Sequence, residues 1–122
     1  MAKSILVVDD SDSVRTIVRI ALRDAGYDVV EAGNGQEALG KLDGTRFSLV
    51  ISDLNMPVMD GLTFLKQLRQ HASCRFTPVI MLTTESGEEH KQEGRAAGAK
   101  AWVVKPFQPA VLVAAVTKLA AG

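Results

Sequence analysis

The stretch VISDLNMP, residues 50–57, decides the fold of this chain. An apolar run that starts at Leu49 leads directly to the carboxylate of Asp53, and the chain then turns at Pro57. Apolar runs of this kind are typical of strands buried on both faces of a parallel sheet. Because ligands of open α/β sheets bind where the strands end, Asp53 is the first candidate for a functional side chain.

Similar apolar runs alternate with helical patterns along the rest of the chain. We predict strands, each followed by a helix, at residues 5–8, 27–32, 47–53, 78–82 and 101–104. The first helix can begin at Ser11 or Ser13. One face of it carries the apolar residues Val14, Ile17, Val18, Ala21, Leu22 and Ala25. The polar segment 86–97 has almost no apolar face and is predicted to form the least stable helix. A last helix is predicted from Pro109 to Ala120.

The alternation predicts an α/β protein with a parallel sheet and helices on both of its faces. Right-handed crossovers leave few strand orders, and doubly wound orders are favoured. A chain of 122 residues is long enough for one domain with one hydrophobic core.

Composition and charge exclude several classes of protein. Lys plus Arg and Asp plus Glu both number 14, so no net charge attracts nucleic acid or an anionic membrane. Apolar residues make up 47%, too many for a disordered chain. No apolar run is long enough for a membrane span or a signal peptide, so we expect a cytoplasmic protein. Cys74 is expected to be partly buried without a role, and His71 and His90 are assigned to solvent.

The carboxyl ends of the predicted strands carry most of the remaining chemical groups. In chain order these are Asp9, Asp10, Asp53, Thr83 and Lys105. In a parallel sheet these ends meet at one edge, so three carboxylates would repel one another, and at least one would keep its proton unless a cation lay among them. Oxygen ligands without His or Cys suit Mg²⁺, and the backbone carbonyl of Asn55 is a further candidate ligand.

This arrangement favours phosphoryl transfer. An oxygen of Asp53 can attack phosphorus in line and form an acyl phosphate. Mg²⁺ and the ammonium group of Lys105 would share the charge of the phosphoryl oxygens, and the Thr83 hydroxyl can donate to another oxygen. Simpler explanations stand beside this one, since acids also cap helices or form turns, and a strand-end hydroxyl or lysine is most often solvated. We favour the functional interpretation because strand ends rarely combine these groups by chance.

Four motifs carry a family resemblance: VVDDS at 7–11, DLNMPVMDG at 53–61, MLTTES at 81–86 and WVVKPF at 102–107. Together they resemble the receiver domain of two-component response regulators, most closely its CheY-like branch of single-domain chemotaxis regulators. The resemblance covers essentially the whole chain. It implies a flavodoxin-like fold with a parallel sheet of five strands in the order 2-1-3-4-5, for which CheY is itself an example. It also implies that residues 1–122 form a single receiver domain without an output domain.

By resemblance, Asp53 is the phosphorylation site and takes phosphate from a histidine kinase or, slowly, from small phosphodonors. The implied ligands of Mg²⁺ are Asp10, Asp53 and the backbone carbonyl of Asn55, with Asp9 in or beside the shell. Thr83 and Lys105 contact the phosphoryl group, and the peptide before Pro106 is cis. Such a receiver is not an enzyme in the ordinary sense, although it assists its own phosphorylation and dephosphorylation.

Further roles follow from the same resemblance. Asn55 and Glu85 occupy the two positions that tune dephosphorylation, and this pair, seen in the chemotaxis branch, favours a short-lived phosphoryl group. Trp102 occupies the position of the switch aromatic, commonly Tyr or Phe, which follows Thr83 inward on phosphorylation. An indole needs a larger pocket and a partner for its N–H, so a static surface role for Trp102 stays open. Thr84 is larger than the residue that many receivers carry beside the site, and is predicted to restrict access.

The implied output surface consists of the fourth helix, the fifth strand and the fifth helix. The segment 107–122 carries one charge, Lys118, and its apolar surface is typical either of an interaction site or of a well-buried helix. We expect a monomer that binds the flagellar motor switch protein, with a phosphatase as a further partner. A phosphate sink or phosphorelay intermediate is the alternative. A flavodoxin-like flavoprotein or an aspartate-dependent phosphatase is disfavoured, because Asp9 and Asp10 repel phosphate and Asn55 stands where a general acid is needed.

Overall fold

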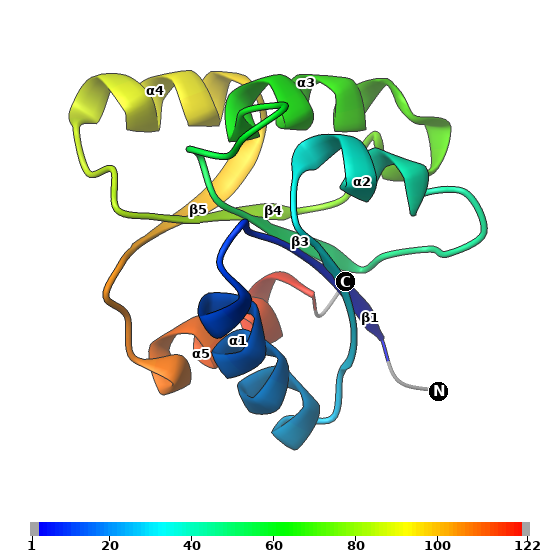
Figure 1. Ribbon diagram of the computed structural model, residues 1–122, viewed down its shortest axis with the longest axis vertical. Helices are drawn as coiled ribbons and strands as arrows, with labels where there is room; N and C mark the ends of the chain where they lie inside the picture. Colours follow the sequence, from blue (N-terminus) through cyan, green and yellow to red (C-terminus); the bar gives the residue numbers. More distant parts are fainter. Residues whose placement is uncertain (1–2, 121–122) are drawn as a thin grey trace.

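The computed structural model describes residues 3–120, which form a five-stranded sheet flanked by helices (Figure 1). All strand pairs are parallel, and the order is β2-β1-β3-β4-β5. The strands are β1 (Ser4–Val8), β2 (Asp28–Ala32), β3 (Leu49–Ser52), β4 (Val79–Thr83) and β5 (Ala99–Val104). The helices are α1 (Asp12–Asp24), α2 (Gly35–Gly40), α3 (Gly61–Gln70), the 3₁₀ turn η1 (Ala72–Cys74), α4 (Glu88–Ala96) and α5 (Pro109–Leu119). The predicted doubly wound order 2-1-3-4-5 is confirmed.

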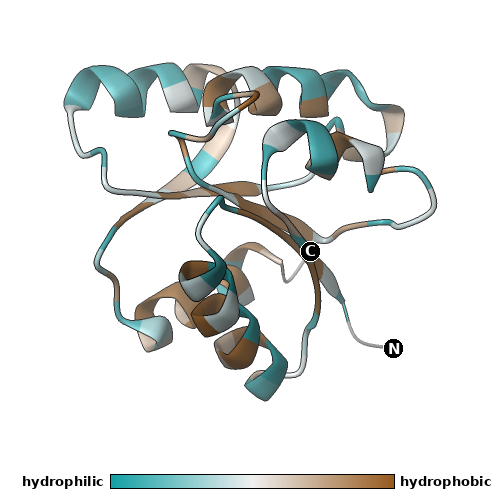
Figure 2. Ribbon diagram, viewed as in Figure 1, coloured by the Kyte–Doolittle hydropathy of each residue, from teal (hydrophilic) through white to brown (hydrophobic). Residues whose placement is uncertain are grey.

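The sheet lies between two layers of helices. α2, α3 and α4 cover one face, and α1 and α5 cover the other (Figure 1). Successive side chains of β3 point to opposite faces, so Val50 packs in one core while Leu49 and Ile51 pack in the other. All residues of β3 are buried, as the apolar run predicts. Figure 2 shows hydrophobic strands inside and an α4 that is mostly hydrophilic.

Side-chain caps mark where α1 and α3 begin. The Ser11 hydroxyl accepts a hydrogen bond from the Val14 N–H at 3.3 Å, so Ser11, rather than Ser13, caps α1. Asp60 Oδ1 accepts from the Thr63 N–H at 2.7 Å at the start of α3. Both caps stand shortly after the carboxyl ends of strands, and they therefore help to place the loops that follow β1 and β3.

Several predicted boundaries differ from the structure. β3 ends at Ser52, so Asp53 already lies outside the strand, and α4 begins at Glu88 rather than at residue 86. β5 begins at Ala99, two residues early, because Ala99 still pairs with Val79 across an irregularity in the register. These differences arise because strand ends depend on pairing with a neighbour, which a local pattern does not contain.

Burial also differs from the predicted pattern in places. Val18 and Leu22 are buried, but Ile17, which was predicted on the same face of α1, is 48% exposed, and Ala25 is exposed. Only the stripe of α1 around Val18 and Leu22 meets the sheet and α5, so residues at its margin remain in solvent. Cys74 is buried rather than partly buried.

The last helix keeps part of its apolar surface outside the core. Leu112 and Val116 of α5 are buried, whereas Val111 is 54% exposed. Residues 121–122 of the segment discussed above lie outside the described residues. Within residues 3–120, every helix is too short or too polar to cross a bilayer.

Candidate functional site

Asp9, Asp10 and Asp53 come together just beyond the carboxyl ends of β1 and β3. One carboxylate oxygen from each lies within 4.8 Å of the others. Asp9 and Asp53 are buried, with 2% and 8% of their surface exposed, whereas Asp10 is exposed. The Asp53 N–H donates to the Val8 carbonyl at 3.0 Å, which ties the two strand ends together. The resulting cluster of oxygen donors is compatible with a site for a hard divalent cation such as Mg²⁺.

Lys105 supplies positive charge to this cluster. Its ammonium Nζ donates to Asp9 Oδ2 at 2.6 Å and to Asp53 Oδ2 at 3.0 Å. Its backbone N–H donates to the Thr83 carbonyl at 2.9 Å, so the end of β4 sets where the chain leaves the sheet. The peptide between Lys105 and Pro106 is cis, as the resemblance implies.

Burial and charge act differently on the two members of this ion pair. Burial raises the pKa of Asp9, although hydrogen bonds from Lys105 and from the Ser11 N–H oppose the shift. Burial by itself lowers the pKa of Lys105, but its bonds to Asp9 and Asp53 outweigh that effect, so the pKa is raised overall. The two directions agree physically: two carboxylates keep the ammonium charged, whereas Asp9 shares one ammonium with Asp53 and loses most of its hydration.

The backbone around Asp53 is packed tightly against the start of α3. Asp53 Oδ1 accepts from the Leu54 N–H at 2.7 Å and from the Asn55 N–H at 3.4 Å. The Gly61 N–H donates to the Leu54 carbonyl at 2.7 Å. A Cβ atom on Gly61 would lie 2.1 Å from the Asp53 carbonyl oxygen, so this close approach requires glycine. Gly61 therefore allows α3 to begin directly against the loop that carries Asp53.

Glu85 joins the remaining predicted site residues. Its Oε1 accepts from Asn55 Nδ2 at 3.0 Å, and its backbone N–H donates to the hydroxyl of the buried Thr83 at 3.3 Å. The Glu85 carbonyl accepts from the indole Nε1 of Trp102 at 2.7 Å. The indole packs on α4, where Cζ3 would lie 2.7 Å from a Cβ atom on Gly94. Trp102 thus has the room and the N–H partner that an indole needs.

Residues 5–117 match the family described as response regulator receiver domain. The chain belongs to this family. Receiver domains are signalling modules rather than classical enzymes, and they interact with histidine kinases. The resemblance drawn from the four motifs is therefore confirmed, including its CheY-like character.

Relatives of this receiver domain share its fold over nearly its whole length. Chemotaxis protein CheY4 of Vibrio cholerae is 48% identical, with a TM-score of 0.94 over 98% of this chain and 99% of that chain. The receiver domain of the sensor histidine kinase PA1611 of Pseudomonas aeruginosa is 25% identical, with a TM-score of 0.90 over 100% of both chains. That receiver domain has a magnesium ion coordinated in its active site cleft.

A longer relative shares only this domain. Transcriptional regulatory protein SrrA of Staphylococcus aureus is 37% identical over 119 residues, which cover 98% of this chain and 48% of SrrA. The chain thus spans about half the length of the curated relatives it matches. The likeness to SrrA therefore concerns the receiver domain alone.

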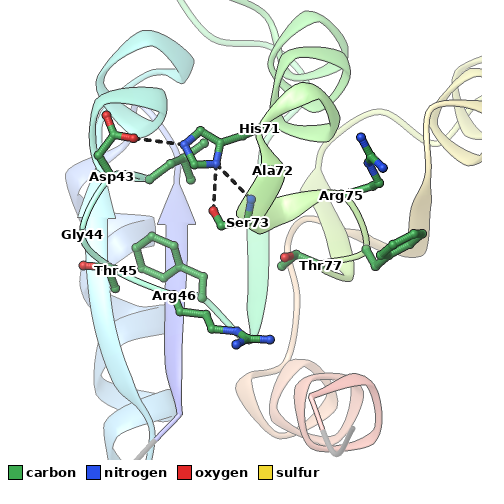
Figure 3. Close-up of a pocket in the computed structure, with 12 residues that line it drawn as sticks. Asp43, Gly44, Thr45, Arg46, His71, Ala72, Ser73, Arg75 and Thr77 are labelled. Carbon is green, nitrogen blue, oxygen red and sulfur yellow. Dashed lines mark hydrogen bonds and ion pairs between the residues drawn. The ribbon is translucent and has the colours of Figure 1, made fainter.

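A wide cavity of about 910 Å³ lies at the opposite ends of the strands, away from the acidic cluster. It is lined by residues 42–47, 71–73 and 75–77, which precede β3 and β4 (Figure 3). His71 Nε2 faces Asp43 Oδ1 at 3.1 Å there, and its Nδ1 lies 2.7 Å from the Ser73 hydroxyl (Figure 3). His71 therefore contacts protein groups rather than solvent alone. It lies at the end of the sheet opposite to Asp9, Asp10 and Asp53.

His90 is exposed, as expected from the polar segment in which it lies. The sequence does not predict its contact with Glu85, whose Oε2 lies 3.6 Å from His90 Nε2. Glu85 precedes α4 and His90 lies within its first turns, so the pair does not follow a helical spacing. Only the path of the loop between β4 and α4 brings the two side chains together, and no pattern in the sequence indicates that path.

Proposed function

We propose that this receiver domain accepts a phosphoryl group on Asp53 from a histidine kinase. The observation that supports this most strongly is the position of the Lys105 ammonium, which bridges Asp9 and Asp53 at 2.6 and 3.0 Å beside a third carboxylate. A lysine so placed can release Asp53 and bind the oxygens of an incoming phosphoryl group without a large movement. The Thr83 hydroxyl, at the end of the neighbouring strand, donates to another of these oxygens.

In the transfer step, a carboxylate oxygen of Asp53 forms a bond to phosphorus. The bond between phosphorus and the donor breaks, and the donor departs with the electron pair, leaving an acyl phosphate on Asp53. Oxygens of Asp9, Asp10 and Asp53 and the carbonyl of Asn55 would hold Mg²⁺, which when bound offsets negative charge on the carboxylates and the phosphoryl oxygens. Lys105 keeps its proton throughout, because its raised pKa favours the charged form.

The phosphoryl group leaves by hydrolysis. Water attacks phosphorus, the bond to the Asp53 oxygen breaks, and inorganic phosphate is released. Asn55 and Glu85, joined by a hydrogen bond of 3.0 Å, flank the site and tune this step. We expect a phosphoryl lifetime suited to rapid signalling, and a half-life of many hours at neutral pH contradicts this expectation.

Output passes through the face formed by α4, β5 and α5, and the partner is the flagellar motor switch protein. Support comes from the 48% identity to a chemotaxis protein over nearly the full length of both chains. Val104 and Val111, which are 38% and 54% exposed on β5 and α5, leave apolar surface for a partner. Trp102 joins this face to the site through Glu85, so a change at the site can reach it. The protein acts in the cytoplasm as a monomer.

Phosphotransfer tests the site directly. Wild type, Asp53→Asn and Asp60→Asn are incubated with Mg²⁺ and either a phosphorylated histidine kinase or an acyl phosphate, and intact mass is recorded. Asp60→Asn is the matched control, because Asp60 is the next carboxylate along the chain and Asn also caps helices. Wild type and Asp60→Asn should each gain one phosphoryl group, and Asp53→Asn should gain none. Equal labelling of Asp53→Asn would overturn the assignment.

Partner binding distinguishes motor signalling from the alternatives. The protein is passed over immobilised motor switch peptide with and without beryllofluoride and Mg²⁺, which together mimic the phosphoryl group. Retention that depends on beryllofluoride supports the motor role. Lack of retention, together with transfer of phosphate from this protein to a histidine phosphotransfer domain, assigns it instead to a phosphorelay.

A further inference from the structure

His90 reaches the dephosphorylation residues from α4. Its Nε2 lies 3.6 Å from Glu85 Oε2, while Glu85 Oε1 accepts a hydrogen bond from Asn55 Nδ2 at 3.0 Å. One carboxylate is therefore placed between an imidazole and an amide, with a different oxygen facing each. The 3.6 Å contact becomes an ion pair when the ring is protonated, and Nε2 also carries a hydrogen in one of the two neutral tautomers.

The contact with Asn55 fixes the orientation of its side-chain amide. Glu85 accepts hydrogen bonds and cannot donate them when ionised, so the Asn55 amide must turn its nitrogen toward Glu85. The side-chain oxygen Oδ1 of Asn55 then points away from Glu85 and is free to accept a hydrogen bond from water. A carboxylate that swings away from Asn55 would leave the amide free to turn over.

Water can reach the space beside the Asn55 side chain. A hollow of about 210 Å³ is lined by Leu54, Asn55, Asp60, Leu62, His90 and Glu93. A water molecule occupies about 30 Å³ in the liquid, so the hollow has room for several. Asn55, which follows Asp53 by two residues, and His90 thus line the same water-accessible hollow.

We infer that His90 is a positioning residue for loss of the phosphoryl group. His90 holds the Glu85 carboxylate against the side-chain amide of Asn55. The side-chain oxygen Oδ1 of Asn55 is thereby kept turned to accept a hydrogen bond from the attacking water. This inference rests on the proposed function, because it concerns the rate at which phosphate leaves Asp53. His90 touches neither Asp53 nor the acidic cluster in the described contacts, so its influence passes through Glu85.

The rate test uses a double-mutant cycle. Phosphoryl loss is measured after removal of the donor for wild type, His90→Ala, His90→Gln, Glu85→Ala and the double variant His90→Ala with Glu85→Ala. His90 and Glu85 are 48% and 37% exposed, so the contact is modest, and we expect His90→Ala to slow phosphoryl loss by about two- to fivefold. His90→Gln, which keeps a donor, should restore most of the rate. In the Glu85→Ala background, removal of His90 should change nothing further.

Glu89→Ala is the matched control, because Glu89 is the adjacent exposed residue on the same turn of α4. Its rate should equal that of wild type. A rate for His90→Ala equal to or faster than that of wild type overturns the inference, as does an equal effect of His90→Ala with and without Glu85. All variants must still gain one phosphoryl group; if wild type gains none, it is the proposed function that fails.

A second measurement needs neither phosphate nor metal. The side-chain amide of Asn55 gives a pair of proton signals in a nitrogen-15 NMR spectrum of the unphosphorylated protein. His90→Ala should shift or broaden this pair toward its appearance in Glu85→Ala, while His90→Gln and Glu89→Ala should leave it in place. An unchanged Asn55 signal in His90→Ala overturns the inference even if the rates differ.

Discussion

At the residue scale, the ammonium of Lys105 lies within hydrogen-bond distance of two carboxylates that would otherwise repel each other. Each of the three groups is largely removed from water, so each depends on the others for its charge. Asp9 gives up the most hydration, and burial is the main reason that its pKa is raised. The site therefore holds stored electrostatic repulsion that a bound cation can relieve.

In metal-free buffer, we expect Asp9 to lower the stability of the protein as the pH rises. The folded state binds this proton more tightly than the unfolded chain does, so stability is lost as the pH rises from the ordinary pKa, 3.8, through the raised value. Urea unfolding, followed by Trp102 fluorescence across this pH range, gives the free energy of unfolding. The difference between wild type and Asp9→Asn should fall with rising pH. Asp24→Asn, at an exposed position, is the control, and a difference that grows with pH would contradict the prediction.

At the scale of the elements, two glycines set how closely helices approach the site. Gly61 starts α3 against the backbone of Asp53, and Gly94 makes room on α4 for the ring of Trp102. Neither has a positive φ, so contact with a neighbour rather than backbone conformation is the reason for glycine at both positions. The two contacts differ in kind, since one neighbour is backbone and the other is a side chain.

Gly61→Ala should destabilise the protein by about 3 kcal/mol, because the new Cβ would meet the Asp53 carbonyl oxygen at 2.1 Å and backbone must move. Gly40→Ala in α2 is the control: no atom lies within 4 Å of its Cβ position, and alanine favours the helix by up to about 1 kcal/mol. Urea unfolding measures both variants. Equal stability of Gly61→Ala and wild type would show that the backbone around Asp53 can move at little cost in free energy.

Gly94→Ala should stabilise the protein in one background at position 102 but not in the other. With Phe at position 102 in place of Trp102, the helix should gain about 1 kcal/mol, the usual difference between alanine and glycine. With Trp102 present, the Cβ would lie 2.7 Å from the ring, so the gain should be lost and the indole emission should shift. Stability and fluorescence of the single and double variants give the coupling. Additive effects within about 0.5 kcal/mol would mean that the ring and helix do not constrain each other.

At the scale of the whole molecule, parallel strands bring chemical groups from distant parts of the sequence to one edge. The first strand ends beside the third, and the fourth and fifth strands follow in order, so acids, hydroxyl and lysine converge there. The large cavity at the opposite ends of the strands is lined by other residues, among them Asp43, His71 and Ser73. Ligand binding at the acidic edge is thus coupled to the stability of the entire sheet.

Mg²⁺ should raise the free energy of unfolding at neutral pH, by about 2.7 kcal/mol when its concentration is a hundred times its dissociation constant. The gain should fade as the pH falls, because protons compete with the metal for the carboxylates. Asp10→Asn should reduce the gain, whereas Asp12→Asn, on the exposed start of α1, should not. Thermal unfolding with Mg²⁺ or with a chelator measures this. An equal gain in Asp10→Asn would remove Asp10 from the metal site.

The sequence by itself determined the fold class, the strand order through the family resemblance, and the set of residues at the strand ends. This was possible because an apolar run followed by an acid is a local pattern, and parallel strands carry all such ends to one edge. The cap of α1 and the exact ends of β3 and β5 were less well determined, since they depend on hydrogen bonds to neighbouring elements.

Only the tertiary structure decided which groups touch. Lys105 lies between Asp9 and Asp53, Trp102 packs over Gly94, and His90 faces Glu85. Ile17 fits a helical apolar face as well as Val18 does, yet only Val18 is buried. The reason is common to all of these cases: a contact between elements depends on how separate segments pack, and the pattern within one segment carries no record of its neighbour's surface.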